Sequence, residues 1–289
     1  MTTSTTNIPQ NCFTESIFWN NMFMSYKYRS VLHEEKTPYQ LIQVFDTYAV
    51  GKLLTLDGKT MVSDKDEFVY HEVITHIPSM VVRDASNVLV IGGGDGGAIR
   101  ELVKYPHYKV IDLVEIDEGV TRVCREFFPQ CTSGLADSRV KIYHEDGINF
   151  VKNKQNFYDI IIIDSTDPQD MATGLFTQSF YSDIFHALKD SGVMVAQAEN
   201  IFLDQYNVKE IFDNMKKVFP IVEGFTAPIT IYPGVFWNFA FASKKFQPTD
   251  INPSNVELMH SVQEKLQWYN MDWHLKAAFT KSNFQKRFY

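Results

Sequence analysis

A short apolar run that leads straight into a glycine-rich loop is the feature that most constrains this chain. Residues 88–91 predict a buried strand, the next six residues include five glycines, and residues 98–104 predict a helix. This succession opens a nucleotide-binding βαβ unit. Three of the glycines have the G-x-G-x-x-G spacing: Gly92, Gly94 and Gly97. Asp95, however, puts a carboxylate where such a loop usually binds phosphate, so the loop predicts a nucleoside ligand that carries positive charge.

Length and composition are typical of a soluble cytoplasmic protein. The 289 residues are 45% hydrophobic, enough for one large α/β domain with a smaller one added. The net charge of −8 and the lack of a basic cluster argue against nucleic acid as a partner. The three cysteines fit no zinc or redox motif, and no apolar run is long enough to cross a bilayer. We therefore expect no metal site and no membrane contact.

The chain divides into a small N-terminal β-strand domain, residues 1–64, and a larger catalytic domain, residues 65–289. The first ten residues are polar, and we expect them to be disordered. Turn residues then separate short strands predicted at 26–32, 40–45, 52–55 and 60–62. A helix is predicted over 66–77, with Pro78 just past its end.

The larger domain alternates between strands and helices. Strands are predicted at 88–91, 110–114, 140–143, 159–163, 193–198, 221–227 and 236–242. Helices are predicted at 98–104, 118–127, 147–152, 178–188, 206–218 and 256–269. This alternation predicts a Rossmann-like sheet of seven mostly parallel strands, with an antiparallel hairpin at one edge. Proteins that bind S-adenosyl ligands, including S-adenosylmethionine-dependent methyltransferases, use such a sheet.

Acidic side chains follow the predicted parallel strands, where ligands bind in open α/β sheets. They are Asp95, Glu115, Asp146, Asp164 and Asp167. One such acid is usually a helix cap, but five on one rim are hard to explain by capping. Glu115 is placed to accept from two ribose hydroxyls, and Asp146 either binds an adenine amino group or caps a helix. Two carboxylates three residues apart, as in Asp164-Ser-Thr-Asp-Pro168, favour a bound cation and raised pKa values.

Taken together, a series of short segments resembles the spermidine synthase family, the polyamine aminopropyltransferases. In order along the chain they are Tyr39-Gln40, Leu56-Asp-Gly58, Asp66-Glu-Phe-Val-Tyr-His-Glu72, Gly92-Gly-Gly-Asp-Gly-Gly97, Glu115-Ile-Asp117, Asp146-Gly147, Asp164-Ser-Thr-Asp-Pro168, Tyr232-Pro-Gly234 and His274-Leu-Lys-Ala-Ala-Phe279. The resemblance implies transfer of the aminopropyl group of decarboxylated S-adenosylmethionine, a co-substrate rather than a cofactor, to putrescine. It also implies a homodimer or homotetramer.

The resemblance assigns roles to individual positions. Asp164 would be the general base, and Tyr232 would place the attacking amine. The thioadenosine part would be held by Gln40, Glu115, Asp146 and Gly147. The aminopropyl and polyamine amines would be contacted by Tyr70, His71, Asp95, Asp164 and Asp167. Ser165 and Gln197 would be further polar positions of the substrate channel.

Three departures from the family pattern lie near the expected acceptor channel, at Cys12, Asp170-Met171 and Thr230-Ile231. They leave the acceptor open among putrescine, agmatine, cadaverine and spermidine. A methyltransferase and a nicotinamide dehydrogenase share the glycine loop and Glu115, and a non-catalytic polyamine-binding protein is a third alternative. Asp95 argues against the first two, because it would repel the carboxylate of S-adenosylmethionine and the pyrophosphate of a dinucleotide.

Overall fold

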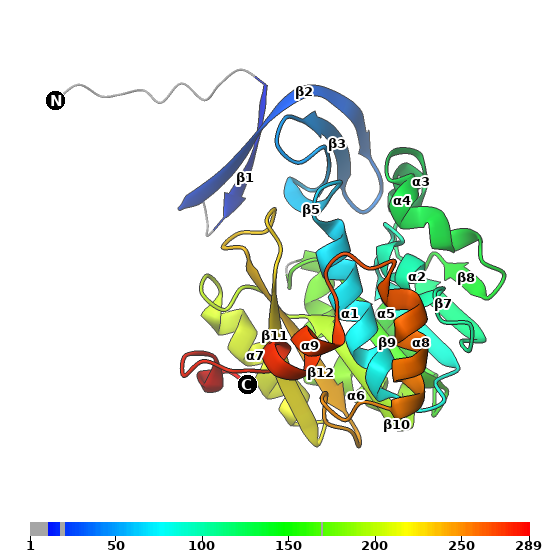
Figure 1. Cartoon of the computed structure of the whole chain (residues 1–289). Helices are drawn as coiled ribbons and strands as arrows, with labels where there is room; N and C mark the ends of the chain where they lie inside the picture. Colours follow the sequence, from blue (N-terminus) through cyan, green and yellow to red (C-terminus); the bar gives the residue numbers. More distant parts are fainter. Residues whose placement is uncertain (1–10, 18–20, 169) are drawn as a thin grey trace.

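The computed structural model describes residues 11–17, 21–168 and 170–289, so the expectation for residues 1–10 lies outside the described residues. An antiparallel five-stranded sheet forms the upper part of the molecule in Figure 1. Its strands are β1 (Cys12–Ile17), β2 (Met22–Lys36), β3 (Leu41–Thr47), β4 (Lys52–Leu56) and β5 (Lys59–Ser63). The sequence prediction missed β1, although its inward side chains alternate strictly with its outer ones.

The larger part contains the predicted seven-stranded sheet, in the order β11-β12-β10-β9-β6-β7-β8. Its strands are β6 (Asn87–Gly92), β7 (Val110–Val114), β8 (Val140–Tyr143), β9 (Tyr158–Asp164), β10 (Leu188–Gln197), β11 (Ile221–Pro228) and β12 (Phe236–Ser243). β6 to β10 run parallel, and β12 pairs antiparallel with both β10 and β11. The expected hairpin therefore lies at one edge of the sheet.

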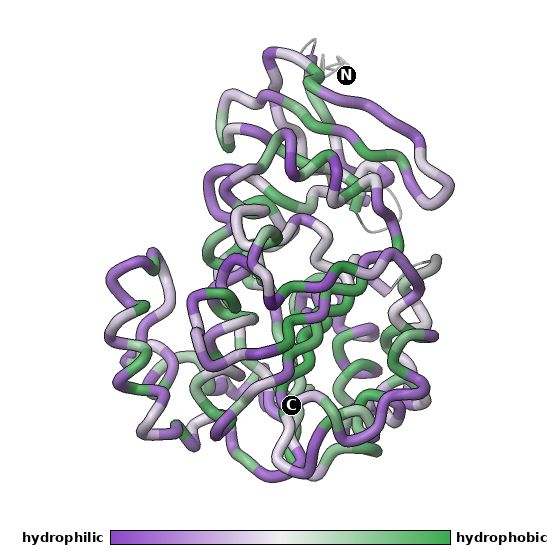
Figure 2. The backbone as a smooth tube through the Cα atoms, turned by 90° about the vertical axis from the view of Figure 1, so that its right-hand side faces the viewer, coloured by the Kyte–Doolittle hydropathy of each residue, from purple (hydrophilic) through white to green (hydrophobic). Residues whose placement is uncertain are grey.

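Helices cover both faces of this sheet. One face packs against α1 (Glu67–Val81), α2 (Gly97–Leu102) and α8 (Pro253–Gln263), and the other against α5 (Gly147–Lys152), α6 (Gln178–Ala187) and α7 (Gln205–Lys216). Val88 and Val90 of β6 point to the first core, whereas Leu89 and Ile91 point to the second. In Figure 2 these central strands form a hydrophobic band inside a largely hydrophilic periphery. No helix among the described residues is long and apolar enough to span a membrane.

A third core joins the small sheet to two helices of the larger part. Side chains of β3 and β4 pack there against α3 (Glu118–Phe127) and α4 (Pro129–Thr132). Ile42 and Leu54 come from the small sheet, and Val123 and Cys124 from α3; all four are fully buried or nearly so. This contact fixes the small sheet over the carboxyl ends of the parallel strands, so residues from both sheets reach the same space.

Two predicted helix boundaries are wrong. α1 continues through Pro78 to Val81, because Ile77, Met80 and Val81 are buried and core packing outweighs the one missing N–H. The predicted helix over 256–269 ends at Gln263. The buried carboxylate of Glu72 accepts hydrogen bonds from the backbone N–H groups of residues 267–269 at 2.7–2.8 Å, which draws that segment out of the helix.

Strand β10 also begins at Leu188, where the sequence predicted the end of a helix and a strand only from residue 193. The remaining C-terminal elements were not predicted. They are a short helix, α9 (Met271–Trp273), a π-helical turn over His274–Ala278 and a 3-10 turn over Gln285–Arg287.

Candidate active site

A cavity opens at the carboxyl ends of the parallel strands, beneath the small sheet. The acids that follow the first four parallel strands all line it. These residues are Asp95, Glu115, Asp146 and Asp164. Gln40 reaches the cavity from the small sheet, and Tyr70 and His71 reach it from α1. The structure therefore brings most of the predicted site residues together in one space.

Glycine is required at two positions of the loop after β6. Gly92 has φ +77°, and a Cβ atom there would lie 2.1 Å from the backbone oxygen of Asp164. A Cβ atom on Gly97 would lie 2.2 Å from Nδ1 of His71. The loop is thus pressed against both β9 and α1, and the N–H of Gly93 donates to the Asp164 carbonyl at 2.8 Å. This packing holds Asp95 beside His71 and Asp164.

Glu115, Gln40 and Asp146 line one end of the cavity. The Glu115 carboxylate accepts from the N–H groups of Gly94 at 3.2 Å and Asp117 at 2.9 Å. Gln40 donates to Asp117 at 2.9 Å, and this bond orients its amide. Asp146 does cap α5, as its alternative interpretation predicted, because it accepts from the N–H of Ile148 at 2.8 Å. Gly147 follows it, and a Cβ atom there would clash with Ile91.

Burial dominates the electrostatics of Glu115. Removal from water raises its pKa to about 7, and the two backbone N–H groups only partly oppose this shift. A ligand that supplies hydroxyl donors would stabilise the carboxylate form, because charge-assisted hydrogen bonds favour the ionised acid.

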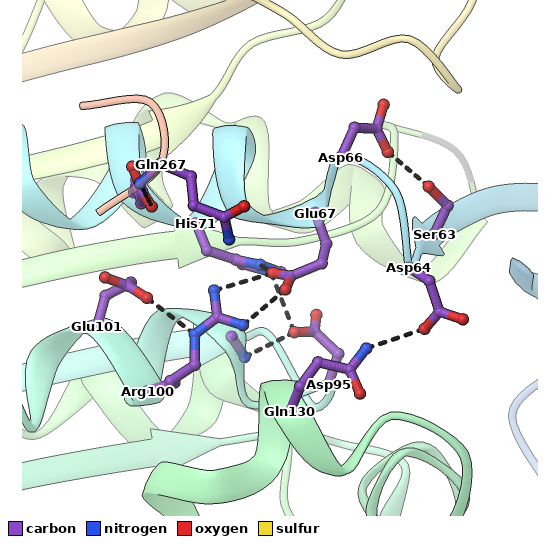
Figure 3. Close-up of polar contacts among 12 residues, drawn as sticks. Ser63, Asp64, Asp66, Glu67, His71, Asp95, Arg100, Glu101, Gln130 and Gln267 are labelled. Carbon is purple, nitrogen blue, oxygen red and sulfur yellow. Dashed lines mark hydrogen bonds and ion pairs between the residues drawn. The ribbon is translucent and has the colours of Figure 1, made fainter. Parts of the chain in front are cut away.

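His71 lies between two carboxylates, as Figure 3 shows. Its Nδ1 is 2.7 Å from Glu67, and its Nε2 is 3.0 Å from Asp95. Although burial opposes a charged ring, these two acids raise the pKa of His71 well above its ordinary value. Both ring nitrogens then carry protons and donate. Burial likewise opposes ionisation of Asp95, but the His71 charge lowers its pKa, so Asp95 stays an anion.

The same network continues away from the cavity through Arg100. Its guanidinium donates to both oxygens of Glu67, at 2.7 and 2.9 Å, and its Nε donates to Glu101 at 2.8 Å (Figure 3). Glu101 is fully buried and also pairs with Lys104 and with His76. Opposite charges therefore alternate from Asp95 into the interior. His76 is fully buried and does not line the cavity.

Asp164 is the last residue of β9 and lies beside Asp95, but it has different partners. Desolvation by the surrounding protein and then the charge of Asp95 raise its pKa to about 6, against the opposing effects of His71 and a hydrogen bond from Tyr70. Among the described residues, its Oδ2 atom has no hydrogen-bond partner. Tyr232 packs edge-on against Tyr70, with ring centroids 6.0 Å apart, and donates to the Met61 carbonyl at 2.9 Å.

Asp167 does not act on Asp164, contrary to the sequence-based expectation. It lines a smaller adjoining cavity with Gln197, and it shares a hydrogen bond with Glu199, a residue that the sequence analysis did not single out. Burial and the neighbouring carboxylate raise the pKa of Glu199 well above its ordinary value. Gln197 is fixed by bonds to the Thr166 carbonyl and to the Glu199 N–H. Ser165 lines both cavities.

Asp66, at the start of α1, holds the loop that carries Tyr232. Its Oδ2 accepts from the N–H and hydroxyl of Thr230 at 2.7 and 2.5 Å, and its Oδ1 accepts from Ser63 at 2.6 Å. Thr230, one of the positions that depart from the family pattern, thus adds a hydrogen bond from its hydroxyl to Asp66. Cys12 pairs with Lys27 across β1 and β2, away from the cavity lining. The side chains of the Asp170-Met171 departure lie outside the described residues.

Comparisons with known proteins agree with this arrangement. Residues 67–253 match the family described as spermine/spermidine synthase domain, and residues 12–64 match the spermidine synthase tetramerisation domain. A polyamine aminopropyltransferase of Alkaliphilus metalliredigens is 45% identical over 256 residues, 88% of this chain and 89% of that protein. The corresponding protein of Clostridium beijerinckii is 42% identical over 257 residues, 88% and 90% of the two chains.

Solved structures give the same result. A spermidine synthase in complex with the transition-state analogue AdoDATO superposes with a TM-score of 0.91 at 35% identity, covering 96% of this chain and 94% of the other. The Thermotoga maritima spermidine synthase gives 0.89 at 35% identity, covering 96% and 93%. The chain therefore belongs to the spermine/spermidine synthase family and is a transferase of the polyamine aminopropyltransferase type.

Proposed function

We propose that this chain is a spermidine synthase, which transfers the aminopropyl group of decarboxylated S-adenosylmethionine to putrescine. The products would be spermidine and 5′-methylthioadenosine. The carrying observation is one cavity that combines a nucleoside-type end around Glu115 with an end where two carboxylates, Asp95 and Asp164, differ in pKa. A permanent anion beside a proton acceptor suits a reaction between two cations.

The donor would lie with its nucleoside at Glu115, Gln40 and Asp146. Its ribose hydroxyls would donate to Glu115, and its adenine would lie near Asp146-Gly147. Its terminal ammonium would face Asp95, which stays ionised through His71. A methyltransferase donor carries an additional carboxylate, and the Asp95 charge would repel it. This repulsion supports aminopropyl over methyl transfer.

In the proposed step, the ammonium of the acceptor first gives a proton to Asp164. The neutral nitrogen then attacks the carbon bonded to sulfur, the carbon–sulfur bond breaks, and the sulfonium becomes a neutral thioether. A free amine has a pKa near 10.4, so with Asp164 at about 6 the transfer costs roughly 6 kcal/mol instead of roughly 9 kcal/mol for an ordinary aspartate. Tyr70 and Tyr232 would orient the amine without adding charge.

We expect no metal ion in this reaction. His71, Asp95 and Asp164 place potential ligand atoms within 4.8 Å of one another. A ring that donates from both nitrogens, however, has no lone pair for a metal. An ammonium group fits the two remaining carboxylates. Full activity after treatment with a chelator would support this expectation, and restoration by an added metal would contradict it.

The assembly and location stay predictions. The match to a tetramerisation domain supports a homotetramer over a homodimer, and sedimentation analysis would distinguish them. The cytoplasmic location rests on composition alone.

The test is incubation with decarboxylated S-adenosylmethionine and each of putrescine, agmatine, cadaverine and spermidine, with identification of products by mass. Spermidine and 5′-methylthioadenosine in equal amounts are expected from putrescine. A faster reaction with another amine would move the assignment to that acceptor. Methylated products with S-adenosylmethionine, and none with its decarboxylated form, would replace it with methyl transfer.

A further inference from the structure

A smaller cavity continues the active site towards the N-terminal sheet. It shares Tyr70, Ser165 and Tyr232 with the main cavity, so the two spaces adjoin beside Asp164. Asp167 and Gln197 line its sides. Glu15 of β1 and Lys59 of β5 line the part contributed by the small sheet. An acceptor whose reacting nitrogen lies at Asp164 would therefore extend its other end towards these residues.

One acid on the wall of this cavity, Asp167, belongs to a buried carboxyl pair that suits one ammonium group. Asp167 and Glu199 share a hydrogen bond, and burial raises the pKa of both acids. Oε1 of Glu199 is buried and has no hydrogen-bond partner among the described residues. A bound ammonium could displace the shared proton and pair with the two oxygens. The far nitrogen of a diamine would be satisfied at this point.

Beyond this pair, the next carboxylate is already occupied. Glu15 is only 4% exposed, and its Oε2 accepts from the N–H of Thr60 at 3.1 Å and from its hydroxyl at 2.7 Å. Its Oε1 lies 3.7 Å from the ammonium nitrogen of Lys59. Lys59 also donates to the Ser16 carbonyl at 2.9 Å, which holds its ammonium at this wall of the cavity. Glu15 is thus left with no free charge for a ligand.

We propose that Lys59 determines acceptor specificity by occupying, with its own ammonium, the place that the third nitrogen of a triamine would need. This inference rests on the aminopropyl transfer proposed above and makes the enzyme selective for diamines over spermidine. The selection works by repulsion, since a like charge meets the terminal ammonium of the longer amine beside an acid that is already paired.

If Lys59 only stabilises the contact between β5 and β1, a different result is expected. Its removal would then lower the stability of the fold and reduce the rates with all acceptors alike. A charge barrier instead changes the ratio between acceptors that differ in one charge. The informative ligand is N-butylputrescine, which matches spermidine in length but ends in a methyl group instead of the terminal ammonium.

The test compares kcat/KM for putrescine, spermidine and N-butylputrescine at saturating donor. In the wild-type protein we expect N-butylputrescine to exceed spermidine by at least about tenfold. In Lys59→Met this ratio should approach one, and the putrescine-to-spermidine ratio should fall at least about tenfold. Lys59→Arg should keep the wild-type ratios. Lys65→Met, which removes an exposed lysine six residues along the chain, is the matched control for lost charge.

Equal rejection of spermidine and N-butylputrescine by the wild type would mean that length and not charge sets the limit, and would overturn the inference. Efficient wild-type use of spermidine would also overturn it. So would unchanged ratios in a folded Lys59→Met protein. These wild-type measurements decide the question even if the variant fails to fold. Absence of aminopropyl transfer to every amine would instead reject the proposed function itself.

Discussion

Replacing Tyr70 with phenylalanine tests whether Asp164 is the base, because the Tyr70 phenol interacts with Asp164 and lowers the pKa of its carboxyl group. Tyr70 is 6% exposed and is held by Tyr232 and Phe239, so phenylalanine should keep the ring in place. The substitution removes the phenol hydroxyl from beside Asp164. Among the described residues, the Oδ2 atom of Asp164 already has no hydrogen-bond donor. The pKa of Asp164 should therefore rise. As the pH is lowered, the variant should then lose activity at a higher pH than the wild type does.

The energy of a full hydrogen bond from the phenol to the carboxylate sets the upper limit of the shift in pKa. A hydrogen bond to a charged group contributes about 1.5–3 kcal/mol, and one pKa unit corresponds to about 1.4 kcal/mol, so the loss raises the pKa by roughly one to two units. The pKa that governs the fall in rate at low pH, the acid limb of the pH–rate profile, should move from about 6 to between about 7 and 8. The sign is fixed, since a base is active only when deprotonated and its rate falls as the pH drops through its pKa.

The assay is kcat/KM for the acceptor against pH, measured by formation of 5′-methylthioadenosine at saturating donor. The positive charge of the bound donor lowers the pKa of Asp164 equally in both proteins. The quantity of interest is therefore the difference in that pKa between the wild type and Tyr70→Phe. Tyr108→Phe, which removes an equally buried phenol bonded to Ser79, is the matched control and should leave the limb in place. Asp164→Asn should abolish the limb and slow turnover by about 100- to 10,000-fold. An unchanged or lowered limb in Tyr70→Phe would refute the assignment.

Three further predictions concern the charged groups around the base. Glu115→Gln should weaken 5′-methylthioadenosine binding by roughly 1.5–3 kcal/mol, and wild-type binding should weaken as the pH falls below about 7; a flat wild-type profile in calorimetry would contradict this. The wild type should bind decarboxylated S-adenosylmethionine more tightly than the parent compound, and Asp95→Asn should shrink this preference; equal wild-type affinities would favour methyl transfer. Arg100→Met should destabilise the fold by about 3–5 kcal/mol in urea unfolding, whereas Arg125→Met on the exposed side of α3 should change little. Although burial opposes it, His71 and Arg100 hold the pKa of Glu67 at about 2, so the stabilisation should persist above about pH 4.5 and disappear as the pH falls towards 2. A difference in stability between the Arg100→Met and Arg125→Met proteins that stays the same at low pH would argue against this.

Much of the main cavity could be predicted from the sequence because its rule is local. An acid at the end of a buried parallel strand, or within three residues after it, lies at the carboxyl edge of the sheet, and Asp95, Glu115 and Asp164 all satisfy this. Glu199 also follows a strand, β10, at a distance of two residues, so the same rule could have found it. Glu67 and His71 have the four-residue spacing of neighbours on one helix face, a further signal that the sequence offered.

Other features could not be derived from local pattern. Glu15 and Lys59 reach the smaller cavity only because the small sheet packs over the larger part of the molecule. That packing joins residues far apart in sequence. The continuation of α1 through Pro78 depends on core packing, which outweighs the usual tendency of proline to end a helix. The pairing of Asp167 with Glu199, instead of with Asp164, likewise depends on where the loop after β9 turns.

The structure gives two neighbouring aspartates opposite properties by giving them different partners. Asp95 contacts a charged His71, whose own charge is supported by Glu67 and, through it, by Arg100. Asp164 receives one phenol hydrogen bond and the repulsion of Asp95. The first acid therefore remains an anion that can hold an ammonium group, while the second has its pKa raised towards that of the amine. Because the charge on Asp95 itself raises the pKa of Asp164, the buried network behind His71 would tune the proposed base without contacting the substrate.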